Sequence, residues 1–185
     1  MTPTNPKDEI VDHLPALRAF AMSLTRNPAM ADDMVQDAVE KAWRNVDKFT
    51  PGTNLRAWLF TILRNTYYSN RRKMKREVAD PEGVFVGQLS AKPAHDGRLQ
   101  LAEFRKAFAQ LPDEQREALV LVGAGGFSYA EAAEMCGCAV GTIKSRASRA
   151  RERLAELMGL SEDEPLEATD LQTMAVVNQQ AGGGY

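Results

Sequence analysis

Two cysteines, Cys136 and Cys138, stand one residue apart, directly before a run of basic residues. Thiolates at short spacing can bind zinc, but a structural zinc site needs about four ligands, often as Cys or Cys/His pairs. The two histidines, His13 and His95, do not stand at zinc spacing; we place them on a helix surface and in a linker. The pattern favours buried, small apolar cysteines and predicts no metal site.

A group of acidic and amide residues lies within nine positions of one predicted helix. Asp33 and Asp37 are four residues apart and share a helix face. Such carboxylates could hold a divalent metal for nuclease chemistry, form a solvated face, or dock on a basic protein surface. The residues alone leave these three readings open. The group comprises Asp32, Asp33, Gln36, Asp37 and Glu40.

The segment "NLRAWLFTILRNTYYSNRRKMKR", residues 54–76, interleaves aromatic and basic side chains. Exposed rings stack on unpaired bases while cations follow the phosphates, so the segment is a candidate single-strand site. The competing reading is that Trp58, Ile62 and Leu63 are core residues. The preceding loop, residues 48–54, could form the rim of a pocket for a flipped base.

A second basic segment, residues 140–157, has helical periodicity. One stripe is apolar and should pack on the preceding helices: Val140, Ile143, Ala147, Ala150, Leu154 and Leu157. The opposite face carries short polar and basic side chains: Thr142, Lys144, Ser145, Arg146, Ser148 and Arg149. A helix-turn-helix presents such a face to the major groove. A capping Ser128, small Ala132 and Ala133, and a turn at Gly137 favour this reading over a solvated structural helix.

The rest of the 185-residue chain predicts an all-α protein of two small helical domains. Ile10, Leu14, Leu17, Ala21 and Leu24 recur at helical spacing. Asn27-Pro28 should start a second helix that buries apolar residues including Trp43, and Asn54 should cap a third. Further helices are expected over residues 99–111, 113–122, 129–135 and 140–158. We expect domains at 1–77 and 98–160, a linker at 78–97, and a mobile acidic, then Gly/Gln-rich tail at 161–185.

Composition and motifs argue against a membrane-spanning protein, a secreted protein and an enzyme. Apolar residues make up 44% of the chain, charged residues 26%, and the formal net charge is −2. Two separated basic patches in a near-neutral chain suggest two contacts on one polyanion. The sequence shows neither a membrane-spanning run nor a signal peptide, so we expect a cytoplasmic protein. No nucleophile–base pair or phosphate loop is visible, so we predict neither catalytic residues nor a cofactor.

Three segments resemble the extracytoplasmic-function sigma factors of bacterial RNA polymerase. They are "ADDMVQDAVEKAWRNVDKF", "RAWLFTILRN" and "LPDEQREALVLVGAGGFSYAEAAEMCGCAVGTIKSRASRARERL", which stand in the order of that family. The resemblance covers roughly residues 11–157, and the last stretch is most similar to the group that governs the general stress response (EcfG-type). It implies a sigma factor that directs promoter-specific transcription initiation, with residues 1–77 similar to region two and 98–160 similar to region four.

The resemblance also implies partners and residue roles. The acidic helix, residues 32–40, would dock on the clamp coiled coil of core RNA polymerase, and the recognition helix would read the −35 element of promoter DNA. The −10 element would be held as a single strand by Phe49, Thr53, Asn54, Arg64, Asn65, Tyr68, Arg71 and Arg72. Ser69 departs from the acidic residue that many members carry there. A small anti-sigma factor, itself titrated by a response regulator, would control the protein.

Two other binding functions remain open from the residues. A helix-turn-helix repressor would bind duplex DNA alone, but it would not need an acidic docking helix followed by an aromatic and basic one. A sigma-like protein that only titrates an anti-sigma factor could lose its basic recognition residues, whereas Lys144, Arg146 and Arg149 are present here.

Overall fold

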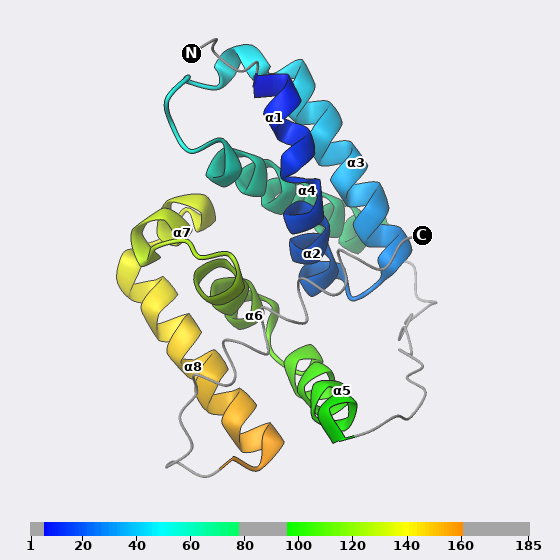
Figure 1. Cartoon of the computed structure of the whole chain (residues 1–185), viewed down its shortest axis with the longest axis vertical. Coiled ribbons are helices and arrows are strands. Elements are labelled where there is room, and N and C mark those ends of the chain that lie inside the picture. Colours follow the sequence, from blue (N-terminus) through cyan, green and yellow to red (C-terminus); the bar gives the residue numbers. More distant parts are fainter. Residues whose placement is uncertain (1–5, 78–95, 161–185) are drawn as a thin grey trace. The chain divides into compact units, whose positions relative to one another are not determined.

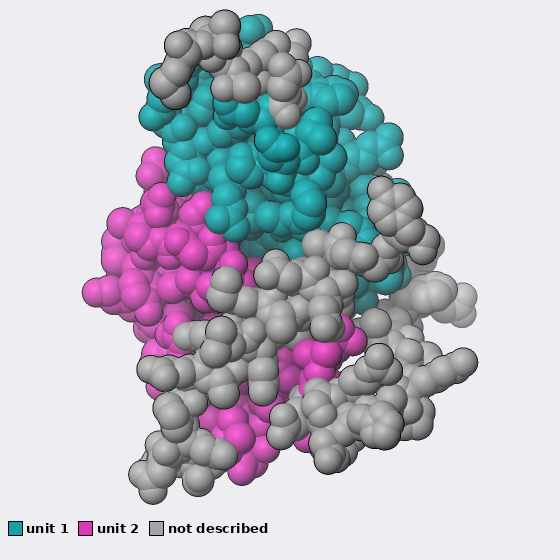
Figure 2. Space-filling view, viewed as in Figure 1, with its two compact units in different colours: residues 1–88 teal, residues 89–185 magenta. Residues whose placement is uncertain are grey.

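A computed structural model describes residues 6–77 and 96–160 of the chain. The chain folds into two compact units, residues 1–88 and 89–185, which are coloured separately in Figure 2. Every regular element in the described ranges is helical, as Figure 1 shows, so the predicted all-α class is confirmed. The predicted tail (161–185) and nearly all of the predicted linker (78–97) lie outside the described residues. None of the described helices is both long enough and apolar enough to cross a bilayer.

Unit 1 is a bundle of α-helices with a short 3₁₀ turn. Its elements are α1 (Pro6–Asp12), α2 (Leu14–Thr25), α3 (Pro28–Arg44), η1 (Val46–Lys48) and α4 (Leu55–Glu77). Helices α2, α3 and α4 pack against one another around buried apolar side chains. The rings of Phe20 and Phe60 stack at the centre, with 5.0 Å between their centroids. This bundle holds the acidic helix α3 beside the aromatic and basic helix α4.

The expectation of one helix from Ile10 to Leu24 is wrong, because the chain breaks at His13. The amide of His13 bonds the carbonyl of Ile10 (3.1 Å), which tightens the end of α1, and α2 restarts at Leu14. Pro15 accounts for the break, since proline has no N–H and restricts the residue before it, while it fits the first turn of a new helix. His13 is half-buried at this junction.

Trp43 was expected in the core, but 48% of it is exposed. The buried stripe of α3 runs through Ala31, Met34, Ala38 and Ala42. Trp43 lies one residue beyond Ala42, about 100° further round the helix, and so falls outside this narrow stripe.

Unit 2 places four α-helices around its own core. Its elements are α5 (Asp96–Ala109), α6 (Asp113–Leu119), a π-helical turn η2 (Val120–Ala124), α7 (Tyr129–Cys136) and α8 (Val140–Met158). Helix α8 packs on α5, α6 and α7. One cluster of buried residues joins α5, α6 and α8: Phe104, Ala107, Leu111, Leu119, Ala150 and Leu154. Arg116 is fully buried and donates to the carbonyl of Leu111 and to Asp113, which fixes the turn into α6.

The π-helical turn replaces the predicted end of the helix at residue 122. The amide of Gly125 bonds the carbonyl of Val120 at 2.6 Å, which closes the wide turn. A Cβ on Gly125 would lie 2.5 Å from the carbonyl oxygen of Leu121 and 2.9 Å from the ring of Phe127. Glycine is therefore required here because the backbone passes too close for any side chain. This turn leads directly into α7.

Candidate nucleic-acid and protein interfaces

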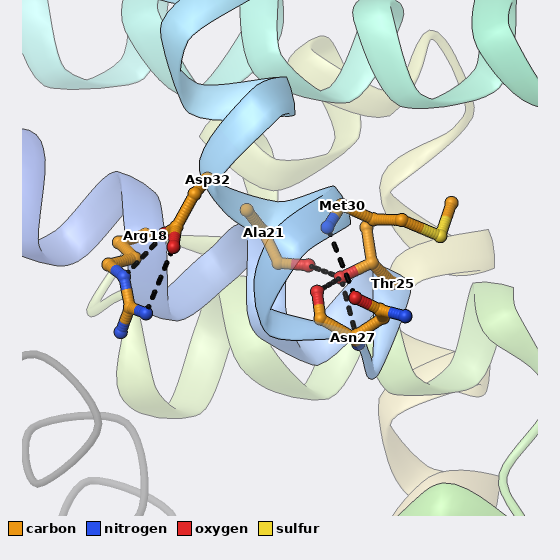
Figure 3. Close-up of polar contacts among 6 residues, drawn as sticks. All are labelled: Arg18, Ala21, Thr25, Asn27, Met30 and Asp32. Carbon is orange, nitrogen blue, oxygen red and sulfur yellow. Dashed lines mark hydrogen bonds and ion pairs between the residues drawn. The ribbon is translucent and has the colours of Figure 1, made fainter. Parts of the chain in front are cut away.

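The corner between α2 and α3 sets the direction of the acidic helix (Figure 3). The Oδ1 of Asn27 accepts a hydrogen bond from the amide of Met30 (3.2 Å), as the sequence predicted for an N-cap. Thr25 donates its hydroxyl to the carbonyl of Ala21 (2.9 Å) at the end of α2. Between them Arg26 adopts the left-handed conformation, with φ of 56°. These local bonds hold the chain reversal before the carboxylates begin.

One member of the acidic group, Asp32, is engaged within the chain. Arg18 of α2 donates through Nε to Oδ1 (2.6 Å) and through Nη2 to Oδ2 (3.3 Å), a two-point contact visible in Figure 3. The hydrogen bond with Asp32 raises the pKa of Arg18. Such a fork fixes the geometry of both groups, so Asp32 ties α3 to α2.

The other predicted docking residues lie on the exposed side of α3. Glu40 accepts hydrogen bonds from the guanidinium of Arg44 (3.2 Å) and from the side-chain Nε2 of Gln36 (3.5 Å). Asp33 and Asp37 are exposed and make no hydrogen bond or ion pair within the described residues. The carboxylates of Asp33 and Asp37 are therefore the members of the acidic group that are available to a basic partner, whereas Asp32 and Glu40 already bond within the chain. No group of three or more potential metal ligands is found among the described residues.

The exposed side of α4 carries paired cations and rings. The guanidinium of Arg64 lies 4.6 Å from the ring centroid of Tyr68, and that of Arg71 lies 5.9 Å from the ring of Tyr67. The two tyrosines meet edge to face at 5.1 Å. Contacts of this kind hold the rings in place while leaving both tyrosines half-exposed. The result is a preformed surface of rings and positive charge.

A pocket of about 510 Å³ lies between the end of α3 and the middle of α4. Its lining is formed by Lys41, Asn45, Lys48, Trp58, Ile62, Asn65, Thr66, Ser69 and Arg72. Lys41 donates to the buried hydroxyl of Thr66 (3.0 Å), so its ammonium is anchored across the two helices. Asn45 donates to the carbonyl of Lys41 (2.7 Å). The pocket thus combines a ring, three cations and amide groups, as a site for an unpaired nucleotide would need.

The structure divides the predicted single-strand residues into three kinds. Asn65 and Arg72 line the pocket, and Arg64, Tyr68 and Arg71 belong to the ring and cation surface beside it. The loop residues have structural contacts of their own. Phe49 packs on Trp58 (5.4 Å between centroids), Thr53 donates to the carbonyl of Thr50 (2.7 Å), and Asn54 caps α4 through the amide of Ala57 (3.0 Å).

Sequence reasoning did not single out Lys41 and Asn45, the pocket residues at the end of α3. Their segment was read for its acids and its apolar face. Lys48, by contrast, belongs to the loop, residues 48–54, that was predicted to form the rim of a pocket. The available signal was a change of charge at the end of that helix, where Lys41 and Asn45 stand one turn apart. Nothing in the sequence joined them to Asn65, because that requires the packing of α3 on α4.

Unit 2 builds the predicted helix-turn-helix from α7 and α8. Ser128 accepts from the amide of Glu131 (3.2 Å) while Glu131 accepts from the amide of Ser128 (2.9 Å), which is a capping box. Gly137 ends α7 in the left-handed conformation, with φ of 63°. The buried Ala132 and Ala133 allow α7 to contact α8 closely. The turn therefore follows from the residues that predicted it.

The predicted recognition residues differ in what they contact. Lys144 lies 5.7 Å from the ring of Tyr129, and Ser148 donates to Glu152 (2.8 Å). Ser145 donates to the carbonyl of Thr142 (3.0 Å). Arg146 donates to Glu114 of α6 at 2.6 Å, while the exposed Arg149 makes no ion pair within the described residues.

Val140 was expected on the buried stripe, but 41% of it is exposed. It is the first residue of α8 and projects beyond the helices that cover Ile143, Ala147, Ala150 and Leu154, which are all fully buried. The prediction of the stripe holds for these four residues and fails at its first position, while Leu157 at its end is partly buried against the core cluster.

Neither of the two cysteines forms a disulfide bond within the described residues. Both are half-buried, Cys136 as the last residue of α7 and Cys138 in the turn that follows, rather than fully buried as expected.

Comparison with known families matches both units. The family model for Sigma-70 region 2 matches residues 10–77, and the model for Sigma-70 region 4 matches residues 101–154. These ranges contain α2 to α4 in unit 1 and, in unit 2, α7 and α8 as far as Leu154.

Individual relatives of the chain are also sigma factors. The chain is 53% identical over 152 residues to the ECF RNA polymerase sigma factor EcfG of Rhodopseudomonas palustris, covering 82% of this chain and 84% of the relative. The sigma factor RpoE of Bartonella quintana, solved in complex with the anti-sigma factor NepR, matches with 54% identity and a TM-score of 0.75, over 85% of this chain and 98% of RpoE.

A more distant structure shares the fold. The PhyRSL–NepR complex from Sphingomonas sp. Fr1 matches with a TM-score of 0.63 at 19% identity, over 85% of this chain and 92% of that one. At this identity the likeness concerns the fold alone. The two regional models and the identity to EcfG carry the assignment, and they show that the chain belongs to the extracytoplasmic-function sigma factors of RNA polymerase.

Proposed function

We propose that the two units of this sigma factor bind one promoter in different states. Unit 1 would hold the −10 element as an unpaired strand, and unit 2 would read the −35 element as a duplex. The observation that carries the proposal is the pocket between α3 and α4, which lies beside a surface of rings and cations within the range matched by Sigma-70 region 2. A duplex-binding repressor would have no use for such a pocket.

The pocket suits a single nucleotide for three reasons. Its volume of about 510 Å³ is ample for one base. Trp58 offers a ring in the lining, and Asn65 offers both a donor and an acceptor to a base edge. Lys41, Lys48 and Arg72 supply positive charge for the adjoining phosphates. We therefore add Lys41, Lys48 and Trp58 to the predicted set of Phe49, Thr53, Asn54, Arg64, Asn65, Tyr68, Arg71 and Arg72.

Unit 2 suits a duplex because its polar face is one rigid helix. Small residues at Thr142, Ser145 and Ser148 let the backbone of α8 approach the groove, and Arg149 is exposed for a guanine or a phosphate. Lys144 is positioned over Tyr129 at the start of α7. Bases are read in this proposal by Arg149 and its short polar neighbours.

We assign docking on core RNA polymerase to the exposed acidic side of α3. Asp33 and Asp37 would meet the clamp coiled coil directly, assisted by Gln36 and Glu40. Asp32 would act through its bond to Arg18, by holding the start of α3 in place. This role is electrostatic, so core binding should weaken as salt rises.

We infer regulation by a small anti-sigma factor, in the general stress response. The support is the relative RpoE of Bartonella quintana, 54% identical, whose structure contains the anti-sigma factor NepR. In this proposal the protein acts in the cytoplasm on the polymerase, catalyses no reaction itself and needs no cofactor. A protein that only titrates an anti-sigma factor would share the fold, but it would not require an exposed Arg149 or the pocket of unit 1.

Run-off transcription with purified core polymerase tests the proposal. The template should carry a promoter of a stress-response gene upstream of a defined end. We expect a run-off product with wild-type protein and none with Asp33 and Asp37 both changed to Lys. A matched control changes Asp47, an exposed acid of η1, to Lys and should keep the product. Absence of initiation by the wild-type chain on every stress-type promoter would contradict the proposed function.

A further inference from the structure

Arg146 and Glu114 form an ion pair that links the recognition helix to α6. The Nη2 of Arg146 lies 2.6 Å from Oε2 of Glu114, although 32 positions separate them in the sequence. The Arg146 side chain is 23% exposed and that of Glu114 is 62% exposed. The guanidinium is therefore partly covered, while the carboxylate remains at the surface of unit 2.

This pair sets Arg146 apart from Arg149, three residues further along the same helix. Arg149 is exposed and makes no ion pair within the described residues, so its charge is available to a ligand. For Arg146, a DNA phosphate would have to compete with a carboxylate that already accepts a charge-assisted hydrogen bond from Nη2. The two arginines thus differ in what a duplex would gain from them.

The difference matters because phosphate contacts carry no sequence information. Each cation that neutralises a phosphate raises affinity for every duplex alike and steepens the salt dependence by about 0.9 in the log–log slope. A carboxylate that withholds one arginine from phosphates would lower affinity for unrelated duplexes. It would leave base contacts made by other residues in place.

We propose that Glu114 is a specificity-determining residue of unit 2, which restrains Arg146 from binding phosphates of non-cognate DNA. The inference rests on the proposed function, in which α8 reads a duplex. Glu114 acts through Arg146 and does not itself contact a base. Glu114 would increase specificity by weakening binding to unrelated DNA, because it keeps Arg146 from a phosphate contact that any duplex could supply.

Fluorescence anisotropy with the full chain tests this inference. The probes are a labelled 20-bp duplex of unrelated sequence and one carrying the upstream promoter element, each titrated between about 50 and 200 mM salt. For Glu114→Gln we expect several-fold tighter binding to the unrelated duplex and a salt slope steeper by about 0.9. The ratio of specific to non-specific affinity should fall. Weaker binding to both duplexes with an unchanged slope would overturn the proposal, because it would mean that Glu114 only supports the fold.

Two further variants separate the mechanism from a simple loss of negative charge. Glu134→Gln removes an exposed acid of α7 that makes no ion pair within the described residues, so it should change the slope less than Glu114→Gln. In an Arg146→Ala background, Glu114→Gln should have no effect. An equal effect with Arg146 absent would refute action through that side chain.

The same titrations distinguish a wrong role for Glu114 from a wrong role for α8 in duplex reading. If the wild-type chain fails to prefer the promoter duplex, the reading of duplex DNA by α8 fails, and the inference fails with it. If the wild type discriminates and Glu114→Gln leaves affinity and slope unchanged, only the inference about Glu114 is wrong. A thermal melt of each variant checks that unit 2 remains folded.

Discussion

Unit 1 and unit 2 both present basic surfaces, but they are built in different ways. In unit 2 the polar face belongs to one helix, α8, which its buried stripe fixes against the core. In unit 1 the pocket exists only where α3 and α4 meet, and Lys41 bonds Thr66 across that junction. A single rigid helix suits a regular groove, whereas a pocket between helices suits an irregular, unpaired strand.

The comparison teaches that charge alone does not define these sites. Both surfaces carry arginines, yet in unit 1 they stack on tyrosines, while in unit 2 one is held by Glu114 and another is exposed. Rings next to cations favour unpaired bases, which can stack on the rings. Short polar residues next to cations favour bases that remain paired and stacked in a duplex.

The largest expected effect separates the folding of the two units. Gly125→Ala would place a Cβ 2.5 Å from a backbone oxygen, so we expect the free energy of unfolding of unit 2 to fall by about 2–3 kcal/mol. Unit 1 should be unaffected. Hydrogen exchange, read separately for each unit, measures this. Gly141→Ala is the matched control, since no atom outside its own helix backbone lies within 4 Å of the new Cβ. Equal protection in wild type and Gly125→Ala would show that the turn can relax.

A second change should break duplex reading alone. Arg149→Ala removes an exposed guanidinium from α8, and we expect binding to the upstream-element duplex to weaken by about 2 kcal/mol. Binding of unit 1 to a single strand should not change. Anisotropy titrations with both probes measure the two effects. Arg153→Ala, on the same helix but paired with Glu156, is the control and should cost less. Unchanged duplex affinity in Arg149→Ala would mean that the register of the recognition face is wrong.

The reciprocal change should affect only the single strand. Tyr68→Ala removes a ring that lies 4.6 Å from the guanidinium of Arg64, and we expect a loss of about 1 kcal/mol in binding to a −10 oligonucleotide. Tyr68→Phe keeps the ring and should retain most of the affinity. If Tyr68→Ala instead weakened duplex binding, the division of labour between the units would be contradicted.

The smallest expected effect concerns pH and lies in unit 1. Burial, reinforced by the nearby charge of Arg56, lowers the pKa of His13 from its usual 6.5. The unfolded chain then binds a proton at a higher pH than the folded chain does. The free energy of unfolding should therefore decrease as the pH falls from above 6.5 through the lowered value. Urea unfolding at pH 7.5 and pH 5 measures this difference for wild type and His13→Gln. The pH dependence should be shallower in the variant, and identical curves would show that His13 does not contribute.

Sequence reasoning succeeded where one contiguous segment contains the whole signal. The cap at Ser128, the turn at Gly137 and the four buried positions of α8 follow from residue type and spacing. It failed where the outcome depends on neighbours. The break at His13 required weighing Pro15 against a continuous apolar pattern, and the exposure of Trp43 required knowing how narrow the contact of α3 is.

The candidate sites show the same limit. Asn65 and Arg72 of α4 were named from the sequence, but the contributions of Lys41 and Asn45 to the pocket depend on tertiary packing. The acidic group was predicted from the sequence as one set, while the bond between Arg18 and Asp32 distinguishes its members. Partner choice within a charged set is decided by geometry that no local pattern encodes.

Footprinting of the holoenzyme on one promoter tests the central claim most directly. Nuclease protection reports duplex contacts and permanganate reactivity reports unpaired thymines. With wild-type protein, we predict protection around the −35 element together with reactive thymines in the −10 element. Arg149→Ala should reduce the upstream protection. An open −10 element with no upstream protection by wild-type holoenzyme would contradict the claim that the two units grip paired and unpaired DNA on the same promoter.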